Sequence, residues 1–198
     1  MNNQKKLSTR VMAGCAMLSA VAVLLMYLEF PIPLLIPAFI KFDFSDLPAL
    51  IGAYAYGPFA GVIIELIKNL FHCVVSKSAT VGELSNFILG SSFVAIAGFV
   101  YKKEKTKKRA IIGGMIGAVL TGLISVVTNY YVVYPFYYRA YMPEEVVLSM
   151  YQAILPSIKS VFMSLIVFNL PFTIIKLAAC VLISMPIYKP IRKVLKDN

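Results

Sequence analysis

Four long stretches of this sequence are nearly free of charged side chains, and they constrain its fold more than any other feature. Residues 11–28, 84–101 and 110–138 carry no charge at all. Residues 160–188 carry only Lys176. A helix that crosses the hydrocarbon core of a bilayer needs about 20 mostly apolar residues, which these stretches supply. The sequence therefore predicts an all-α integral membrane protein rather than a transmembrane β-barrel, which would show short segments of alternating polarity.

The net charge of +10 comes mainly from three basic clusters, which hold 13 of the 19 Lys and Arg residues. The clusters are Lys5, Lys6 and Arg10; Lys102, Lys103, Lys105, Lys107, Lys108 and Arg109; and Lys189, Arg192, Lys193 and Lys196. In a soluble protein this charge would suggest nucleic-acid binding, but basic residues also collect in the cytoplasmic loops of membrane proteins. Because the apolar stretches favour a membrane protein, we expect a lipid bilayer around the chain and no nucleic acid as a partner.

Charge parity between the basic clusters predicts the number of spans. If all three clusters are cytoplasmic, an even number of spans separates each pair. The apolar stretch 47–76 is too long for one span, since about 30 residues of helix measure roughly 45 Å against a core of about 30 Å, and Gly57-Pro58 at its centre favours a break. The six predicted spans are residues 11–29, 46–57, 58–75, 81–101, 110–134 and 157–188. We expect one integral membrane domain over residues 1–198, with both termini in the cytoplasm.

The loop after the first predicted span, residues 30–46, is apolar but cannot form a regular helix. It contains Pro31, Pro33 and Pro37 together with large apolar side chains such as Phe39. In the predicted topology this loop lies on the outer side of the membrane. We expect it to form a lid over an outward-facing cavity, and the alternative is a loop that only packs on the helix ends.

The third predicted span carries polar residues spaced by three and four, which places them on one helix face. They are Glu65, Lys68, Asn69 and His72. Ionisable residues at membrane depth are costly and usually mark function or helix pairing. These residues form a polar wall, or an internal ion pair that couples movements, or a structural pair near the membrane interface in which Lys68 snorkels. We slightly favour the structural pair, because one stripe with a single histidine is weak evidence for a proton path.

Polar residues of the fourth and fifth predicted spans are candidates for ligand binding. Asn86 lies one turn after Glu83, whose carboxylate could simply complement the dipole at the start of the helix. Asn129 precedes Tyr130 and Tyr134, which could form only an interfacial aromatic belt. Because a buried amide needs a hydrogen-bond partner, we expect Asn86 and Asn129 to be the stronger candidates.

The sixth predicted span contains the spacing that most indicates a binding site. Asn169, Thr173 and Lys176 follow one another at intervals of four and three, so they share one helix face. Lys176 is also the only charge within residues 160–188. We therefore expect this face to line a pocket.

Sequence motifs of catalysis are absent. The chain contains no G-x-x-x-x-G-K-[ST] phosphate loop and no H-E-x-x-H zinc motif. Its single histidine and its three separated cysteines, Cys15, Cys73 and Cys180, favour neither a metal site nor a disulfide framework. We therefore expect no enzyme and no catalytic cofactor, but a binding subunit that works with other chains.

Six segments, spread over almost the whole chain, resemble the riboflavin-binding S components of energy-coupling factor (ECF) transporters. They are residues 43–52, 56–61, 65–70, 82–87, 129–135 and 170–176, which include the motifs D-F-S-D-L-P and G-P-F-A-G. The resemblance implies a multi-pass protein of a bacterial plasma membrane, with an outward-facing vitamin site closed by the loop after the first helix. It implies as partners a transmembrane coupling protein and two cytoplasmic ATPase subunits. The family's A-x-x-x-A signature, which docks on the coupling protein, matches Ala16 and Ala20.

The resemblance also implies residues that bind the flavin. Asn129 and Lys176 match an asparagine of the fifth helix and a lysine of the sixth helix that contact riboflavin in this family. Thr173 stands where the family has an asparagine, which departs from the pattern. Asn169, one turn earlier, is a candidate to compensate for that change.

Riboflavin as a transported ligand fits the chemistry of these side chains. The pyrimidine edge of a flavin alternates carbonyl acceptors with an N–H donor, which an Asn carboxamide and a Lys ammonium can match. Its broad rings require apolar walls, which Phe39, Tyr130 and Tyr134 could supply. Riboflavin is uncharged, and Arg139 stands nearly alone as a candidate to bind a phosphate. The alternatives are an S component for another vitamin or flavin derivative, and a membrane assembly subunit that transports nothing.

Overall fold

The apolar stretches of the sequence form a bundle of helices. The computed structural model describes residues 9–76 and 78–196, so the predicted cytoplasmic residues Lys5 and Lys6 lie outside the described part, as do the side chains of the third basic cluster. The α-helices are α1 (Thr9–Tyr27), α2 (Asp46–Tyr56), α3 (Pro58–His72), α4 (Val81–Lys103), α5 (Lys107–Thr128), α6 (Tyr134–Ala140), α7 (Glu144–Gln152), α8 (Val161–Ser164) and α9 (Leu170–Lys196). Short turns of other helical types follow α3, join α5 to α6 and join α8 to α9, and these are η1 (Cys73–Val75), η2 (Asn129–Val133) and η3 (Leu165–Asn169).

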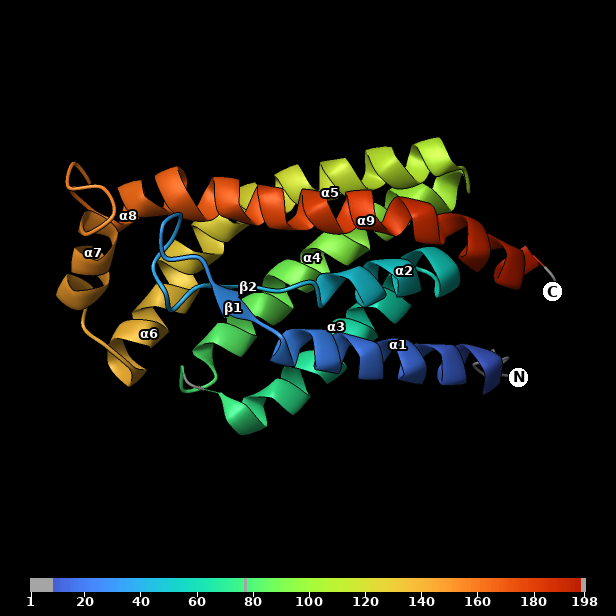
Figure 1. Cartoon of the computed structure of the whole chain (residues 1–198), viewed down its shortest axis with the longest axis horizontal. Helices are drawn as coiled ribbons and strands as arrows, with labels where there is room; N and C mark the ends of the chain where they lie inside the picture. The colour runs from blue at the N-terminus through green and yellow to red at the C-terminus, as the bar shows by residue number, and fades with distance from the viewer. Residues whose placement is uncertain (1–8, 77, 197–198) are drawn as a thin grey trace, which may run out of the picture.

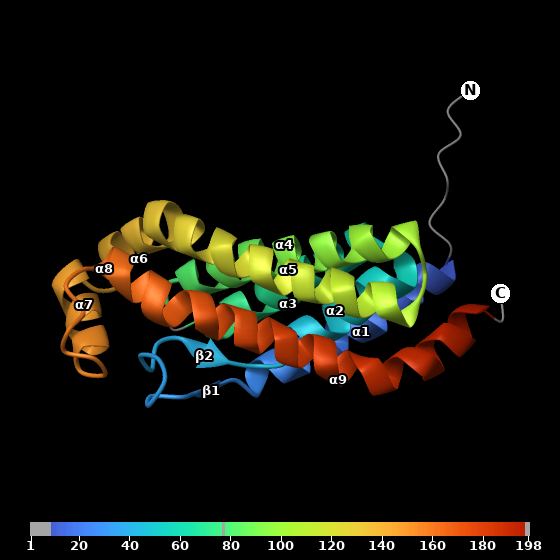
Figure 2. The same cartoon turned by 90° about the horizontal axis from the view of Figure 1, so that it is seen from above.

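Helices α1, α5 and α9 run roughly along the long axis of the molecule, α3 and α4 cross it obliquely, and α7 stands across it at one end (Figure 1). We call one end the terminal end, because α1 begins there, α9 ends there, and the turn between α4 and α5 lies there (Figure 1). The opposite end, which we call the loop end, carries α6, α7, α8 and a two-stranded hairpin. In the view from above, α9 crosses beside α5 and the hairpin lies along the first half of α9 (Figure 2).

Five helical segments among the described residues are long and apolar enough to cross a bilayer. They are Thr9–Tyr27, Pro58–Val75, Val81–Lys103, Lys107–Ala140 and Val161–Ile187. The predicted second span, 46–57, is not among them. Its helix α2 has 11 residues, or about 16 Å at 1.5 Å per residue, which is shorter than the hydrocarbon core of about 30 Å.

The predicted break at Gly57-Pro58 is confirmed. Gly57 has a φ of 104°, a conformation that residues with a side chain rarely adopt. Pro58 begins α3, where its missing N–H leaves no hydrogen bond unmade. Residues 46–72 therefore form two helices that pack against each other instead of one long helix.

Small residues let the helices of the half near the terminal end approach closely. The core of this half includes Ala22, Ala49, Ala53, Ala97, Ala110 and Ala118. A Cβ atom placed on Gly61 would lie 2.8 Å from the Cβ of Ala53, and one on Gly113 would lie 2.9 Å from the carbonyl oxygen of Ala97. The row of Gly113 and Gly117 thus faces α4 with almost no space between the backbones.

Aromatic and branched side chains pack the half near the loop end. Strands β1 (Phe30–Pro31) and β2 (Lys41–Phe42) pair antiparallel and close the loop between them into a hairpin. The buried residues of this half are Ile36, Val81, Val126, Val133, Tyr134, Tyr137, Val147, Tyr151, Ile158, Val161 and Leu165. Ile36 of the hairpin loop is fully buried, whereas Leu34 is 88% exposed. The prediction that residues 30–46 form no regular helix is confirmed, and the loop packs on its neighbours.

Two wide helical turns at the loop end each lie just before a proline. Both η2 (Asn129–Val133) and η3 (Leu165–Asn169) are π-helical. Pro135 and Pro171 follow at the same distance, two residues after each turn ends. A proline inside a helix lacks an N–H donor and clashes with the carbonyl four residues earlier, and a wider turn relieves that conflict. The helix therefore continues to Ala140, beyond the predicted end of the fifth span at 134.

Candidate ligand-binding site

A cavity of about 460 Å³ lies inside the loop end of the bundle. It is lined by Met26, Glu29, Ala38, Phe39, Ile40, Lys41, Asp43, Asp46, His72, Ser78, Gly82, Glu83, Ser85, Asn86, Leu89, Gly90, Asn129, Val133, Tyr134, Tyr137, Tyr141, Met142, Met150, Asn169, Phe172, Thr173, Lys176 and Leu177. Pockets that hold small molecules typically measure about 300–1,000 Å³. The predicted ligand-binding residues all line this cavity, with the exception of Tyr130.

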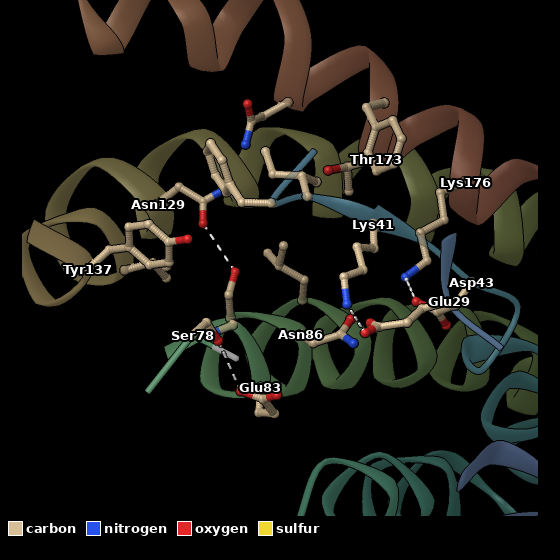
Figure 3. A pocket seen from close by; sticks show the side chains of 18 of the residues that line it. Glu29, Lys41, Asp43, Ser78, Glu83, Asn86, Asn129, Tyr137, Thr173 and Lys176 are labelled. Carbon is tan, nitrogen blue, oxygen red and sulfur yellow. Dashed lines mark hydrogen bonds and ion pairs between the residues drawn. The ribbon is translucent and has the colours of Figure 1, made fainter. Parts of the chain in front are cut away.

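Polar side chains from three separate helical segments meet at the cavity. Asn86 comes from α4, Asn129 from η2 and Thr173 from α9, and Figure 3 shows them around the same space. The Ser85 hydroxyl donates a hydrogen bond to Asn129 Oδ1 at 3.1 Å. This bond holds the Asn129 carbonyl toward α4 and leaves its NH₂ group to donate elsewhere. The fold thus brings together amides that the sequence places only on separate spans.

Lys176 reaches the cavity, but its charge is balanced there by two carboxylates. Its Nζ lies 2.8 Å from Asp43 Oδ2 and 3.2 Å from Asp46 Oδ2, and the contact with Asp43 is visible in Figure 3. Asp43 follows strand β2 and Asp46 begins α2, so these ion pairs tie the hairpin to α9. An ammonium group has three N–H donors, which leaves one donor of Lys176 for a ligand.

A second lysine extends this charged network into the core of the bundle. Lys68 Nζ lies 2.6 Å from Asp46 Oδ1 and 2.9 Å from Glu65 Oε2. It also donates to Ser45 Oγ at 2.8 Å. The predicted ion pair between Glu65 and Lys68 is therefore confirmed. The idea that Lys68 snorkels to the membrane interface is wrong, because the side chain is 0% exposed and its partners lie in the interior.

Further carboxylates line the cavity near the junction of α3 and α4 and at the base of the hairpin. Glu83 accepts a hydrogen bond from Ser76 Oγ at 2.8 Å and lies 2.8 Å from His72 Nδ1. Glu29 forms an ion pair with Lys41, and His72 Nε2 lies 3.7 Å from Glu29. Glu83 therefore has specific partners beyond the dipole of α4, and this set of contacts joins the hairpin to α3 and α4.

Two tyrosines and an asparagine form a closed ring of hydrogen bonds beside the cavity. The Tyr151 hydroxyl donates to Asn169 Oδ1 at 2.6 Å, and Asn169 Nδ2 donates to the Tyr134 hydroxyl at 3.4 Å. The two hydroxyl oxygens are 2.6 Å apart. Tyr151 belongs to α7, outside the segments of spanning length, and its burial raises the pKa of its hydroxyl well above the usual range. The hydroxyl therefore stays neutral and can donate at ordinary pH.

Aromatic rings form part of the cavity wall, but Tyr130 does not contribute. Phe39 of the hairpin loop packs against Tyr137, with ring centroids 5.5 Å apart, and both rings line the cavity. Tyr130 is 41% exposed and packs on Phe162 at 5.3 Å. It directly follows Asn129 in η2, but its ring turns outward onto Phe162 and away from the cavity.

Sequence reasoning misses several residues that line the cavity. Glu29 lies in a loop, Lys41 in the short strand β2, and Tyr137 in a helix that continues past the expected end of its span, so no periodicity singles them out. Asp43 and Asp46 carry a signal, because two acidic residues precede an apolar helix in the D-F-S-D segment. A charged pair next to an apolar span requires a buried cation as partner, which would have pointed to Lys176 and Lys68.

The residues predicted to dock on another chain lie on the outside of the bundle. Ala16 and Ala20 are both exposed on α1. Their neighbours Met12, Met17 and Leu24 are large apolar residues that are at least half exposed. This face of α1 is available to lipid or to a second membrane protein.

Helices of membrane-spanning length around a small-molecule cavity define a membrane-embedded binding protein. The model of the family described as "ECF transporter, substrate-specific component" matches residues 10–188. The chain belongs to this family. A solved structure described as the S component of a bacterial ECF transporter superposes with a TM-score of 0.74 and 29% sequence identity, over 96% of this chain and 99% of that chain.

Curated relatives in the family are named as riboflavin transporters. The chain is 36% identical over 140 residues to riboflavin transporter RibU of Staphylococcus aureus (strain TCH60), covering 69% of this chain and 74% of the relative. It is 37% identical over 125 residues to riboflavin transporter FmnP of Bacillus subtilis (strain 168), covering 62% of this chain and 65% of the relative. These relatives are transporter components rather than enzymes.

Proposed function

We propose that this chain is the riboflavin-binding, substrate-specificity subunit of an ECF-type vitamin uptake transporter. The observation that carries the proposal is the cavity of about 460 Å³, in which amides from α4 and η2 and an ammonium from α9 meet aromatic walls. The names of the curated relatives support the same ligand.

The polar groups of the cavity match the polar edge of a flavin. The free NH₂ group of Asn129 can donate to a ring carbonyl, and the remaining N–H of Lys176 can donate to another. The Asn86 carboxamide offers both a donor and an acceptor. Thr173 replaces a family asparagine with one hydroxyl, which still offers one donor and one acceptor at that position. Phe39 and Tyr137, whose rings are tilted by 35° to each other, supply aromatic wall for the flavin rings.

The proposed topology has six crossings with both termini in the cytoplasm. In it, α2 and the extended segment that begins at β2 together form the second crossing, since the helix alone is too short. The basic turn between α4 and α5 then faces the cytoplasm, as basic loops do. The cavity opens on the outside of a bacterial plasma membrane, and the hairpin loop forms its lid.

The proposed partners are a transmembrane coupling protein and two cytoplasmic ATPase subunits. The exposed face of α1 around Ala16 and Ala20 is the docking surface, because small residues allow a second helix to approach closely. The chain itself contains no phosphate loop, so ATP hydrolysis has to come from other subunits.

Purification of the full chain in detergent tests the ligand. We expect the protein to bind riboflavin in a 1:1 complex, with quenching of flavin fluorescence on titration. A protein that binds no riboflavin contradicts the proposal. Competition with flavin mononucleotide and with unrelated vitamins distinguishes riboflavin from another flavin or vitamin, which is the alternative function.

A further inference from the structure

One residue behind the cavity connects three parts of the molecule. Tyr151 is fully buried, although it belongs to α7, which lies outside the helical segments of spanning length. Its ring packs edge-on against Phe39 of the hairpin loop, with centroids 6.1 Å apart. Its hydroxyl reaches Asn169 and Tyr134, which both line the cavity. Tyr151 itself is not part of the cavity wall.

The ring of hydrogen bonds fixes the orientation of the Asn169 amide. A carboxamide has one acceptor oxygen and two N–H donors. The oxygen accepts from Tyr151 at 2.6 Å, a length typical of a good O–H···O bond. One N–H donates to Tyr134. Within the described residues the other N–H of Asn169 has no hydrogen-bond partner, and it belongs to a side chain in the cavity wall.

We propose that Tyr151 is a positioning residue of the ligand site, which holds the Asn169 amide so that one N–H donates to the bound molecule. The inference rests on the proposed function, because the molecule to be positioned is riboflavin. A ring carbonyl of the flavin is the acceptor of this N–H. The ring of Tyr151 also packs against Phe39. The same residue therefore contacts both the hairpin loop and the Asn169 amide.

The substitution Tyr151→Phe isolates the hydroxyl, because the phenyl ring keeps the contacts with Phe39 and Phe168. Without the donor, the Asn169 carbonyl is buried without a partner and the amide turns toward other groups. We expect riboflavin affinity to fall about tenfold, the size of one net hydrogen bond. The matched control is Tyr131→Phe, which removes the same atom from a ring that is 72% exposed, and we expect its affinity to equal that of the native chain.

A double-mutant cycle shows whether Tyr151 acts through Asn169. Asn169→Ala removes the amide, so Tyr151→Phe should weaken binding by less than about twofold in that background, since residues in one network are not additive. An undiminished tenfold effect of Tyr151→Phe in the Asn169→Ala background overturns the proposal. Native affinity of the single Tyr151→Phe variant also overturns it.

The variant Asn169→Asp and melting of the ligand-free protein cover the case in which Tyr151→Phe does not fold. If Tyr151→Phe does not fold, Asn169→Asp retains an acceptor for Tyr151 but lacks the amide N–H, and its affinity should fall about tenfold. Native affinity of Asn169→Asp overturns the proposal. Thermal melting without ligand separates lost stability from lost affinity, and we expect Tyr151→Phe to melt about 2–4 °C below the control while remaining folded. If the native chain binds no riboflavin, the proposed function fails, which is a different result from a native chain that binds and a variant that binds equally well.

Discussion

The two halves of the bundle are packed by different kinds of side chain. In the half near the terminal end, glycine and alanine rows bring backbones into contact, so that a Cβ atom on Gly113 would lie 2.9 Å from the carbonyl oxygen of Ala97. In the half near the loop end, tyrosines, phenylalanines and branched residues hold the helices apart. A cavity of about 460 Å³ remains between these wider-spaced helices.

This difference indicates where stability and where binding reside. Close backbone packing leaves no space for a ligand, so the half near the terminal end serves as a rigid base. Wider spacing leaves internal polar groups that a ligand, water or another polar residue has to satisfy. The buried network of Lys68, Lys176 and Asp46 lies between the halves and connects the base to the site.

The largest expected effect on stability comes from breaking the buried ion-pair network between the two halves. Lys68→Met leaves the carboxylates of Asp46 and Glu65 buried without their shared cation, which should lower the free energy of unfolding by about 3–5 kcal/mol. Arg109→Met is the control, because its ion pair with Glu104 is about half exposed and should contribute less than about 1 kcal/mol. Denaturant unfolding of the purified protein in detergent measures both. Equal destabilisation by the two substitutions would show that the network does not support the fold.

The next effect tests the rigid base. Gly113→Ala forces a methyl group against the backbone of α4, and overpacking of this kind costs about 1–3 kcal/mol. We expect a lower melting temperature together with native riboflavin affinity in the protein that remains folded. The control is Ala16→Val, an enlargement on the exposed face of α1 that should leave melting unchanged. A loss of affinity in folded Gly113→Ala protein would contradict the division between the halves.

A smaller effect tests the site. Asn129→Ala removes an amide of the cavity wall that we propose to contact the ligand, without removing any buried apolar contact, so riboflavin affinity should fall about tenfold. Unfolding of the ligand-free protein should change by less than about 1 kcal/mol, because only the bond from Ser85 is lost. Isothermal titration and melting measure the two quantities. Ser85→Ala is the control, and it should weaken binding only severalfold, since it orients the amide but leaves it in place.

The smallest effect on the isolated chain is expected on the outer face of α1. Ala20→Leu adds bulk where a partner helix approaches, so assembly with the coupling protein should weaken while riboflavin affinity stays native. Val21→Leu, at the next exposed position, is the matched control. Co-purification with the other transporter subunits measures assembly. Impaired binding with intact assembly is the opposite pattern, and it would place the role of Ala20 inside the bundle.

The sequence predicts most of the helices because membrane crossings require long apolar runs. The break at Gly57-Pro58 and the shared face of Glu65 and Lys68 also follow from local rules of helix geometry. Asn129 and Lys176 stand out as polar groups in apolar spans, and both line the cavity. The Asn129→Ala variant tests whether Asn129 binds riboflavin.

Other features depend on contacts between segments that are distant in the sequence, and rules of helix geometry within one span cannot predict them. Lys176 forms an ion pair with Asp43, 133 positions earlier in the sequence. The carboxylate that balances its charge therefore cannot be predicted from its own span. Tyr130 is wrongly predicted because its ring packs outward on Phe162, a contact with a residue 32 positions away that its own span does not reveal.

The two π-helical turns before Pro135 and Pro171 affect how the site responds to an occupant. Asn129 and Asn169 both belong to these turns, where the regular ladder of backbone hydrogen bonds is already interrupted. We expect the walls beside these amides to adjust their width at little cost, while the straight helices beyond them stay unchanged. The protein can therefore close around a bound ligand by bending at η2 and η3.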